Sequence, residues 1–267
     1  MEWELLEHYI RFQRASDAYV FAFDVRYDVR TIVCPAPGVA PQDRDVPERA
    51  SVSARFMLED YPDAAPTAAD VPMIVSSTMN ELSSAWTDSS LEKVTLDEVV
   101  EKVKERAGFR AGFGDKAREV VEAYAKAFPD KKPVEIWSLV SSTRQSTVAL
   151  ADAKSKQPAP VYVDWFAWQP PLFDGRLGAF HCIDISFWFY NTDLMLTHSG
   201  GGARPRKLSA RMAGSLLQFM KTGNPNGGGL PTWPRYTSAN GETMVLDDVS
   251  EVRNDPDREA RKALPPL

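Results

Sequence analysis

Two side chains in this sequence have types and positions suited to acid–base chemistry. His181 follows Gly178 by three residues in a short loop and precedes an apolar stretch, residues 183–189. Because α/β enzymes commonly place a general base on a loop beyond a strand, His181 is a candidate for that role. A hydrogen-bonded core histidine is the alternative interpretation, and the spacing alone leaves both open.

Glu81 is the second candidate. It lies six residues beyond a continuous apolar run, residues 71–75, which is typical of a strand buried on both faces of a parallel sheet. The carboxyl ends of such strands face the crevice in which these sheets bind ligands, so a carboxylate there could take part in chemistry. An exposed loop acid is the alternative interpretation of Glu81.

Metal and cofactor chemistry find no support in the sequence. His8, His181 and His198 are far apart, and none has a second histidine or a cysteine pair at metal-ligand spacing, so we expect no metal. No G-x-x-x-x-G-K-[ST] or G-x-G-x-x-G motif occurs, so we expect no phosphate loop and no cofactor. Cys34 and Cys182 cannot make a disulfide framework and are interpreted as buried, inert thiols.

Composition narrows the class of protein. The 267 residues carry a formal charge of −6, which argues against nucleic acid as a partner, and 43% of them are hydrophobic, which predicts a globular core. No apolar run approaches the ~20 residues of a membrane span, so we expect no membrane partner. The first residues lack the features of a signal peptide. We therefore expect a soluble, by default cytoplasmic protein, with its true compartment and oligomeric state left open.

The pattern of expected elements is that of an α/β fold. Strands are expected at residues 19–25, 71–75, 160–166 and 243–246, the last of which would close the sheet. Helices are expected from a capping box at Thr95 to Gly108, at residues 116–128, in one long helix from Pro133 through Leu150, and at residues 205–221. A Pro-rich surface connection occupies residues 34–70. Strands alternating with helices in this way favour an α/β architecture.

Three ordered segments carry a resemblance to a known family. Residues 70–81 (DVPMIVSSTMNE) resemble the segment of type-B carboxylesterases that holds the acid of the catalytic triad. Residues 175–189 (GRLGAFHCIDISFWF) are similar to the histidine segment of that family, G-A-x-H-x-x-E-I-x-F-x-F. Residues 222–226 (TGNPN) and 230–236 (LPTWPRY) resemble the family's T-G-D-P-N…W-P-x-Y tail. The resemblance covers about residues 62–250.

The resemblance implies a fold and a division of the chain. The fold would be an incomplete α/β-hydrolase fold, in which the C-terminal part of a mostly parallel sheet is covered by helices. Residues 1–61 are an unassigned N-terminal segment with the Pro-rich connection, residues 62–250 the carboxylesterase-like region, and residues 251–267 a polar tail. A parallel sheet without its N-terminal strands would expose an apolar edge, so we expect poor solubility unless the strand near Tyr19 covers that edge.

The resemblance also implies roles for individual residues. His181 would be the general base that takes the proton of the nucleophile, and Glu81 would hold the histidine tautomer and stabilise the imidazolium. Asp184 occupies the acidic position of the family three residues after the histidine and would support this pair. Ser76 stands where the family usually has glycine, and Cys182 replaces a small residue.

The nucleophile that such a triad needs is missing from the sequence. No G-x-S-x-G motif occurs, and no Gly-rich oxyanion loop precedes Glu81. Ser199 and Ser215 have glycine neighbours but do not fit the motif, and both follow the acid instead of preceding it. We therefore expect no nucleophile in this chain and no esterase turnover by the chain alone.

Three hypotheses about function follow. The chain is the C-terminal portion of a carboxylic ester hydrolase, acting on a small carboxylic ester only when an N-terminal half completes it. Alternatively, it is a non-catalytic binding or interaction protein derived from the carboxylesterase fold. The third possibility is an α/β domain whose motifs are relics of packing.

Overall fold

The computed structural model describes residues 20–23, 32–33, 69–81, 88–108 and 110–266. Nearly all of the predicted Pro-rich connection lies outside the described residues, as do His8 and Cys34.

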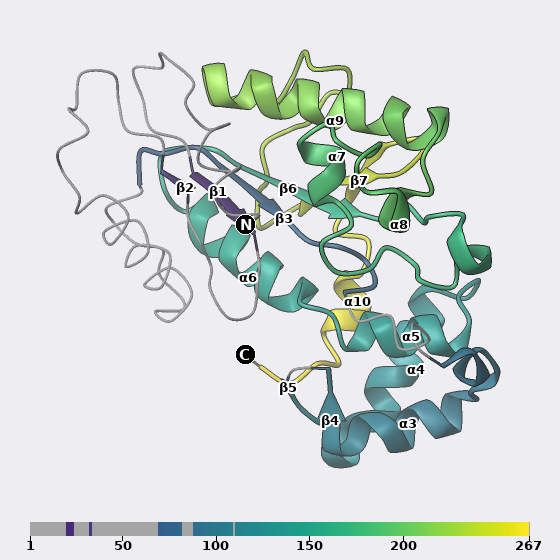
Figure 1. The fold of residues 1–267 in the computed structure, drawn as a ribbon. Helices are drawn as coiled ribbons and strands as arrows, with labels where there is room; N and C mark the ends of the chain where they lie inside the picture. The colour runs from purple at the N-terminus through teal and green to yellow at the C-terminus, as the bar shows by residue number, and fades with distance from the viewer. Residues whose placement is uncertain (1–19, 24–31, 34–68, 82–87, 109, 267) are drawn as a thin grey trace, which may run out of the picture.

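A six-stranded sheet in the order β2-β1-β3-β6-β7-β8 forms the centre of the described structure (Figure 1). The four inner strands run parallel, while the two edge strands, β2 and β8, are antiparallel to their neighbours. This mixed, mostly parallel sheet agrees with the predicted α/β class. The strands are β1 (Val20–Phe23), β2 (Ile32–Val33), β3 (Met73–Ser76), β6 (Val161–Phe166), β7 (Glu242–Leu246) and β8 (Glu251–Asn254).

Helices cover the sheet on both sides and form a separate group at one end (Figure 1). The α-helices are α3 (Leu96–Glu105), α4 (Ala117–Ala127), α5 (Pro133–Val140), α6 (Arg144–Ser155), α7 (Ile185–Trp188), α8 (Leu196–Ser199), α9 (Ala203–Thr222) and α10 (Arg258–Arg261). Short 3-10 turns are η2 (Ser89–Lys93), η3 (Gly114–Lys116) and η4 (Leu172–Gly175), and a small hairpin joins β4 (Arg106–Ala107) to β5 (Arg110–Ala111).

Side chains that alternate along β3 and β6 divide the core between the two faces of the sheet. Met73 and Val75 pack on one face with Leu150 of α6. On the other face, Phe166 meets Phe187 of α7 with ring centres 5.0 Å apart, and Tyr162 of β6 packs against a ring of α9. Four aromatic residues of β6 and α7, together with the tryptophan two residues beyond β6, are fully buried: Trp165, Phe166, Phe187, Trp188 and Trp168.

The helix ends show which sequence signals were sufficient to predict where a helix begins or ends. The capping box of α3 is present, because Glu98 N–H donates to Thr95 Oγ1 at 3.2 Å and Thr95 N–H donates to Glu98 Oε2 at 2.8 Å. The single long helix expected from Pro133 is wrong, because the chain leaves the helix after Val140 and re-enters it at Arg144. The break falls on Ser-Ser-Thr, residues 141–143, of which the Ser141 and Thr143 hydroxyls are buried without a hydrogen-bond partner among the described residues.

The C-terminal residues add an edge strand that the sequence analysis did not expect. Strand β7 does not close the sheet, because β8 pairs with it in antiparallel register, with Met244 opposite Val252. The segment expected as a polar tail, residues 251–267, thus contains β8 and α10. A strand at a solvent-facing edge keeps charged side chains, which explains why its composition resembled a tail.

Strand β1 covers the edge that was expected to be exposed. It pairs in parallel with β3, with Val20 opposite Met73 and Phe23 opposite Ser76, and β2 pairs with its outer side. The expected covering by the strand near Tyr19 is therefore present in the backbone pairing. The solubility of the chain remains a prediction.

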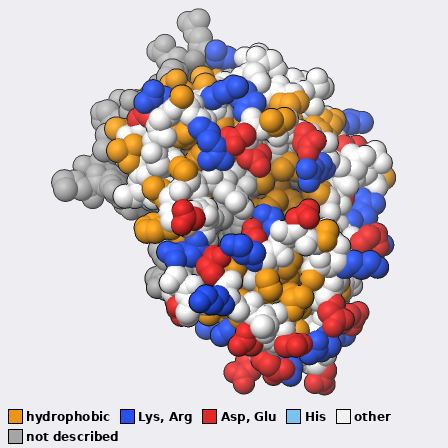
Figure 2. All heavy atoms as spheres, turned by 90° about the vertical axis from the view of Figure 1, so that its right-hand side faces the viewer, with side chains coloured by type: hydrophobic (Ala, Val, Ile, Leu, Met, Phe, Trp, Pro, Cys, Tyr) orange, Lys and Arg blue, Asp and Glu red, His pale blue; other side chains and the backbone are white. Residues whose placement is uncertain are grey.

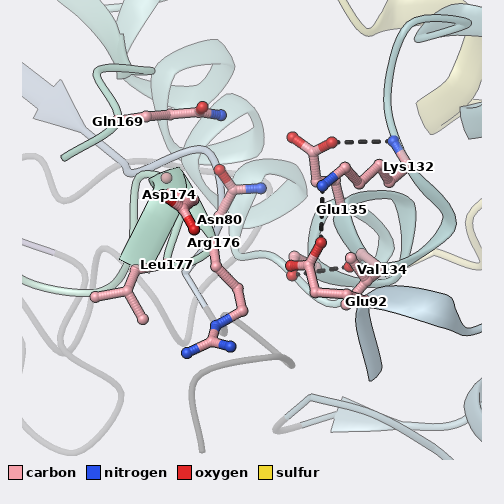
Figure 3. A pocket seen from close by; sticks show the side chains of 12 residues that line it. Asn80, Glu92, Lys132, Val134, Glu135, Gln169, Asp174, Arg176 and Leu177 are labelled. Atoms are coloured by element: carbon pink, nitrogen blue, oxygen red, sulfur yellow. Dashed lines mark hydrogen bonds and ion pairs between the residues drawn. The ribbon is translucent and has the colours of Figure 1, made fainter. Parts of the chain in front are cut away.

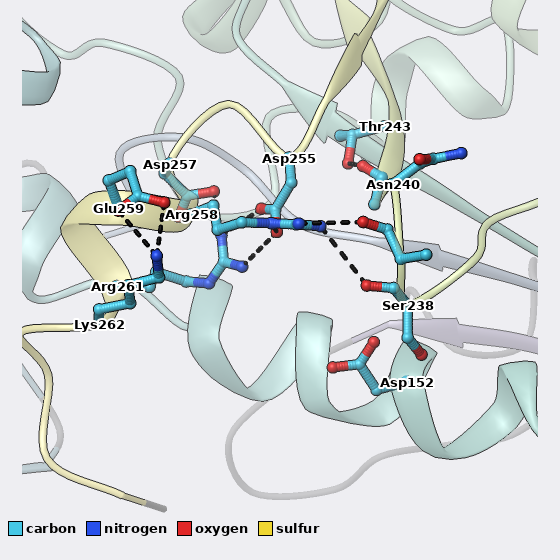
Figure 4. Close-up of polar contacts among 12 residues, drawn as sticks. Asp152, Ser238, Asn240, Thr243, Asp255, Asp257, Arg258, Glu259, Arg261 and Lys262 are labelled. Carbon is cyan, nitrogen blue, oxygen red and sulfur yellow. Dashed lines mark hydrogen bonds and ion pairs between the residues drawn. The ribbon is translucent and has the colours of Figure 1, made fainter.

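Ion pairs join the C-terminal residues to one another and to α6, and Figure 4 shows Asp255, Asp257, Arg258 and Arg261 of this group. Arg144 Nε donates to Asp257 Oδ1 at 3.3 Å, and both side chains are at most 1% exposed. Arg261 pairs with Asp257 and, at 2.6 Å, with Asp255, which also accepts from Arg258 at 2.7 Å. These five residues are called the C-terminal charge cluster below.

The surface carries charges of both signs. On the face in Figure 2, Lys and Arg side chains alternate with Asp and Glu around groups of hydrophobic side chains. Among the described residues, no helix has the length and apolar character needed to cross a membrane.

Candidate active site

Backbone hydrogen bonds fasten together the two loops that carry the predicted site residues. After β3 the chain continues beside β6, because Met79 N–H donates to the carbonyl of Phe166 at 2.8 Å. Asn80 N–H then donates to Ala179 at 2.9 Å, and His181 N–H donates to the carbonyl of Glu81 at 3.2 Å. The loop after β3 and the loop before α7 thus lie side by side, although about 100 residues separate them in sequence.

One glycine makes this close approach possible. Gly178 has φ of +59°, and a Cβ atom on it would lie 2.6 Å from Asn80 Oδ1. That same oxygen accepts a hydrogen bond from Ala179 N–H at 3.0 Å. A larger residue at position 178 would therefore be strained in backbone conformation and would also displace the side chain that holds the loops together.

Glu81 and His181 meet at the end of these loops. His181 Nδ1 and Glu81 Oε2 are 2.5 Å apart, with Glu81 buried and the His181 side chain 40% exposed. The second carboxylate oxygen, Oε1, is 3.4 Å from Thr78 N–H. The structure thus brings together the two residues that the sequence analysis singled out first. The pairing through Nδ1 directs the other ring nitrogen, Nε2, away from Glu81.

The surroundings of His181 favour its charged form. Hydrogen bonds with the side chains of Cys182 and, second, of Glu81 raise the pKa of His181 to about 10. Burial opposes this shift but does not cancel it. At neutral pH the ring of this chain therefore holds its proton as an imidazolium paired with Glu81.

Cys182 differs from its sequence interpretation. It is a free thiol, half-buried instead of fully buried, and it has φ of +67°, a left-handed conformation that is uncommon for residues other than glycine. This backbone conformation turns the chain from His181 into α7. The contact with His181 means that its side chain belongs to the electrostatics of the site and is not part of the core.

Asp184 lies beneath the pair together with two residues that the sequence analysis did not place there. Ser76 Oγ donates to Asp164 Oδ1 at 2.8 Å and lies 3.4 Å from Asp184 Oδ2. All three side chains are buried, and Asp164, in the middle of β6, is inaccessible to water. Asp184 is thus linked through Ser76 to Asp164 at the centre of the sheet, and its supporting role stays a prediction.

Both aspartates bind protons more tightly than usual. Burial raises the pKa of Asp184 to about 7, with a further contribution from the negative charge of Glu81. Burial also raises the pKa of Asp164 well above its ordinary value, although the hydrogen bond from Ser76 opposes the shift. The sequence held a signal for this group, because an aspartate in the middle of an apolar strand and a serine at the end of another are unusual.

The two serines with glycine neighbours do not present exposed hydroxyls to the Glu81–His181 pair. Ser199 and Ser215 are both fully buried, and the Ser199 hydroxyl donates to the carbonyl of Thr192 at 2.8 Å. In the part of the chain that the structure describes, no group of three or more His, Cys, Asp or Glu side chains is placed to hold a metal ion.

A polar cavity of about 130 Å³ adjoins the loop pair (Figure 3). Asn80, Gln169 and Arg176 line one side, and residues at the start of α5 line the other. The charged residues on that second side are engaged with one another, since Lys132 pairs with Glu92 at 2.7 Å. Asn80, which lines the cavity, directly precedes Glu81 in the chain.

Comparison with known proteins places this architecture in a family. The profile of the carboxylesterase family matches residues 38–263, which extends beyond the residues over which the motifs were recognised. The chain is 33% identical over 123 residues to the para-nitrobenzyl esterase of Bacillus subtilis (strain 168), covering 45% of this chain and 24% of that protein. It is 26% identical over 198 residues to the phenmedipham hydrolase of Pseudarthrobacter oxydans, covering 70% of this chain and 38% of that protein.

A solved structure agrees with the sequence relatives. An esterase from Clostridium hathewayi, described as hydrolysing aliphatic aromatic polyesters, superposes with a TM-score of 0.59 at 27% identity, covering 75% of this chain and 38% of that one. The chain therefore spans well under half the length of these relatives. The sheet is that of the carboxylesterases, which have the α/β-hydrolase fold. With a family profile that matches most of its residues, the chain belongs to the carboxylesterase family.

Proposed function

We propose that this chain supplies the acid and the histidine of a carboxylic ester hydrolase, with Glu81 and His181 in these roles and Asp184 in support. The nucleophilic serine and the oxyanion donors would come from an N-terminal half that completes the site. The substrate would be a small carboxylic ester, and the chain alone would show no turnover. In this proposal residues 62–250 form the functional region.

The observation that carries the proposal is the contact between Glu81 and His181. A buried carboxylate on Nδ1 fixes the ring orientation and leaves Nε2 to exchange a proton with a nucleophile. When the nucleophile attacks, the proton moves to Nε2 and then to the leaving alcohol, while Glu81 stabilises the imidazolium. The order of acid before histidine in the chain is that of α/β-hydrolases.

Two features support the expectation that the chain is inactive alone. The sequence has no G-x-S-x-G motif, so His181 has no predicted nucleophile to activate. The imidazole also holds its proton at neutral pH, because its pKa is raised by Cys182 and Glu81, and a protonated ring cannot accept another proton. A completing half would have to change the surroundings of the ring as well as supply the serine.

Exposed apolar side chains flank the histidine segment and support the need for a completing half. Phe173 is 63% exposed before the histidine, while Tyr190 and Leu194 are 61% and 82% exposed after it. Large apolar side chains that water reaches are a common feature of surfaces that another polypeptide covers. Their positions on either side of His181 in the chain suit a partner that contacts the site itself.

The proposal can be tested by reconstitution. The purified chain would be mixed with the separately expressed N-terminal part of the para-nitrobenzyl esterase, and hydrolysis of a chromogenic short-chain ester would be followed. We expect no turnover from the chain alone and turnover from the mixture. His181→Ala should lower that turnover by roughly 10⁴-fold or more, because a triad without its base retains little of its rate.

Matched variants separate a catalytic loss from a folding defect. His198→Gln replaces another histidine, one that lies against Phe180 and outside the pair, and should leave the turnover of the mixture within a few-fold of wild type. Glu81→Gln should reduce it strongly. If sedimentation shows that the two parts associate and still no ester is hydrolysed, the enzymatic proposal is wrong.

That last outcome would favour a second candidate function. The missing nucleophile motif and the left-handed Cys182 beside the histidine suit a non-catalytic binding or interaction protein built on the carboxylesterase fold. In that case the association would be retained by His181→Ala, since the imidazole would have no chemical part in it.

A further inference from the structure

The group formed by Ser76, Asp164 and Asp184 contains more acceptors than donors if both carboxyl groups are ionised. The Ser76 hydroxyl has a single hydrogen, and it is given to Asp164 Oδ1 at 2.8 Å. With its hydrogen directed at Asp164, the Ser76 hydroxyl, 3.4 Å from Asp184 Oδ2, makes at most a shared donation to an ionised Asp184, whereas it can accept a hydrogen bond from a protonated one. If Asp184 were ionised, the lone pairs of its carboxylate would face those of the Ser76 oxygen in a buried site.

We propose that Ser76 and Asp164 are positioning residues of the Glu81–His181 pair: the Ser76 hydroxyl links the carboxyl groups of Asp164 and Asp184, which share a proton, so that Asp184 stands beside Glu81 as a neutral acid. This inference rests on the proposed function of that pair. It adds two residues from the inner strands β3 and β6, neither of which the predicted site contained.

The geometry of the sheet makes the link possible. Val75 lies opposite Val163 in the parallel pairing of β3 with β6, so the next residues along, Ser76 and Asp164, are neighbours on the same face. That face is covered by α7, and Asp184 is the residue immediately before this helix. The second oxygen of Asp164, Oδ2, is buried and has no hydrogen-bond partner among the described residues. A second negative charge beside Asp164 would therefore be poorly compensated, which favours holding one proton in this group.

The charges that face the group come from several elements. Asp184 is influenced by Glu81 and His181 as well as by Ser76, and Asp164 is influenced by Asp184 and by Arg144 of α6. Glu81 disfavours charge on Asp184, whereas the imidazolium and Arg144 favour the ionised forms. Burial acts in the same direction as Glu81 on Asp184 and is the largest influence on both aspartates.

A neutral Asp184 matters to the pair above it. Were Asp184 ionised, a second carboxylate would lie near the imidazole and compete with Glu81 for its proton and its orientation. With the proton shared over Ser76, Glu81 keeps its contact with Nδ1 without this competition. Release of the shared proton to solvent leaves two carboxylates and adds a negative charge beside His181. This added charge would change the chemical shift of the His181 ring.

An NMR titration of the His181 ring tests whether the nearby proton is released. The full chain has three histidines, so ¹H–¹³C NMR of the ring Cε1 position gives three signals, and the His181 signal is assigned from its loss in His181→Gln. Between pH 5 and 9 we expect an inflection in its shift near pH 7 as the shared proton leaves, separate from the titration of the ring itself. The measurement involves no ester, so a failure to hydrolyse esters would leave its result intact.

The variant Asp164→Asn tests whether Asp164 and Asp184 share a proton. Asparagine keeps an oxygen that accepts from Ser76 but cannot ionise, so the remaining carboxyl group loses its proton more easily, and the inflection should move at least one pH unit lower. Ser76→Ala should also move it, because the hydroxyl that links the two carboxyl groups is lost. Asp152→Asn, which replaces a carboxylate bonded to Tyr236 at the other side of the sheet, should leave it in place.

Two outcomes would overturn the proposal. One is a His181 titration curve without an inflection between pH 5 and 9 in the wild-type chain. The other is an unchanged inflection in Asp164→Asn or, should that variant fail to fold, in Ser76→Ala with a native circular dichroism spectrum. A purely structural role of Ser76 and Asp164 would alter stability but would not move the inflection.

Discussion

Two buried groups of acidic residues in this molecule have opposite electrostatic properties. Near the proposed active site, Asp164 and Asp184 have raised pKa values because they are buried. In the C-terminal charge cluster, Asp255 is also nearly inaccessible, and burial acts to raise its pKa, but hydrogen bonds from Arg261 and Arg258 outweigh burial and lower it. Burial alone therefore does not determine which carboxyl groups are ionised.

The difference lies in the groups that face each carboxylate. Asp255 meets two guanidinium groups at 2.6 and 2.7 Å. Asp184 meets a hydroxyl and the negative charge of Glu81. One group holds fixed charges that fasten the C-terminal residues to the sheet, and the other holds a proton that can be released near neutral pH. The first arrangement serves stability and the second suits a site where protons move.

Breaking the charge cluster should have the largest effect on stability. Asp257→Ala removes the carboxylate that pairs with Arg144 and leaves that guanidinium, 1% exposed, without it. We expect the free energy of unfolding to fall by about 3–5 kcal/mol, the range for a buried ion pair that loses one partner. Urea unfolding followed by tryptophan fluorescence measures the loss, since Arg144 lies 4.9 Å from the centre of the Trp165 ring.

An exposed ion pair provides the control for that experiment. Asp97 pairs with Arg118 at 2.9 Å, but the two side chains are 80% and 55% exposed. Asp97→Ala should therefore leave the free energy of unfolding nearly unchanged. Equal losses in the two variants would show that burial of the cluster does not set its strength.

The comparison also explains which features could be predicted from sequence. Local signals were sufficient for α3 and for the end of α9, where Thr95 caps the helix and Gly223 adopts the left-handed conformation after it. Glu81 and His181 could be paired because motifs with ordered spacing carried them. In each case the informative residues are near one another in sequence or match a known pattern.

The features that were missed depend on contacts between distant residues. Arg144 and Asp257 are 113 residues apart, and Ser76 and Asp164 are 88 residues apart. Neither pair has a spacing rule, since only the strand order and register bring them together. The break between α5 and α6 was missed for a related reason, because the apolar pattern continues through Ser-Ser-Thr and only tertiary packing decides that the helix ends there.

The pH dependence of stability should distinguish the two groups. The pKa of Asp184 is raised to about 7 by burial, so between pH 4 and 7 the folded chain holds a proton that the unfolded chain has released. Stability attributable to this group therefore falls as pH rises through that window, opposite to the usual carboxylate. Asp184→Asn removes the dependence and should be about 2 kcal/mol more stable than wild type at pH 8, with little difference at pH 4.

Asp255 gives the opposite sign and serves as the reference. Its pKa is lowered by Arg261 and Arg258 against the effect of burial, so its contribution is present at neutral pH and is lost as pH falls through the acidic range. Urea unfolding of wild type and Asp184→Asn at pH 4, 6 and 8 measures the Asp184 trend, because the Asp255 contribution is lost only below the ordinary carboxyl pKa and stays constant over this range. A constant difference between the two proteins over this range would contradict a titrating Asp184.

His181 should produce the smallest of these effects and in a different window. Contacts with Cys182 and Glu81 raise its pKa to about 10, so the folded chain binds a proton that the unfolded chain loses near pH 6.5. The resulting stability is complete below pH 6.5 and is lost as pH rises to 10. Because the side chain is 40% exposed and water screens the pair, we expect only about 1 kcal/mol.

The variant His181→Gln tests this contribution. Its free energy of unfolding should lie below that of wild type at pH 6 and approach it by pH 10, because the protonated ring no longer contributes to the wild-type chain there. His198→Gln should show no such convergence, since burial lowers the pKa of His198 instead of raising it. A gap between His181→Gln and wild type that stays the same at pH 6 and pH 10 would mean that the pair stabilises the fold through packing alone. In that case the charge on the imidazole would not be what joins the two loops, and the contrast with the C-terminal charge cluster would rest on the aspartates only.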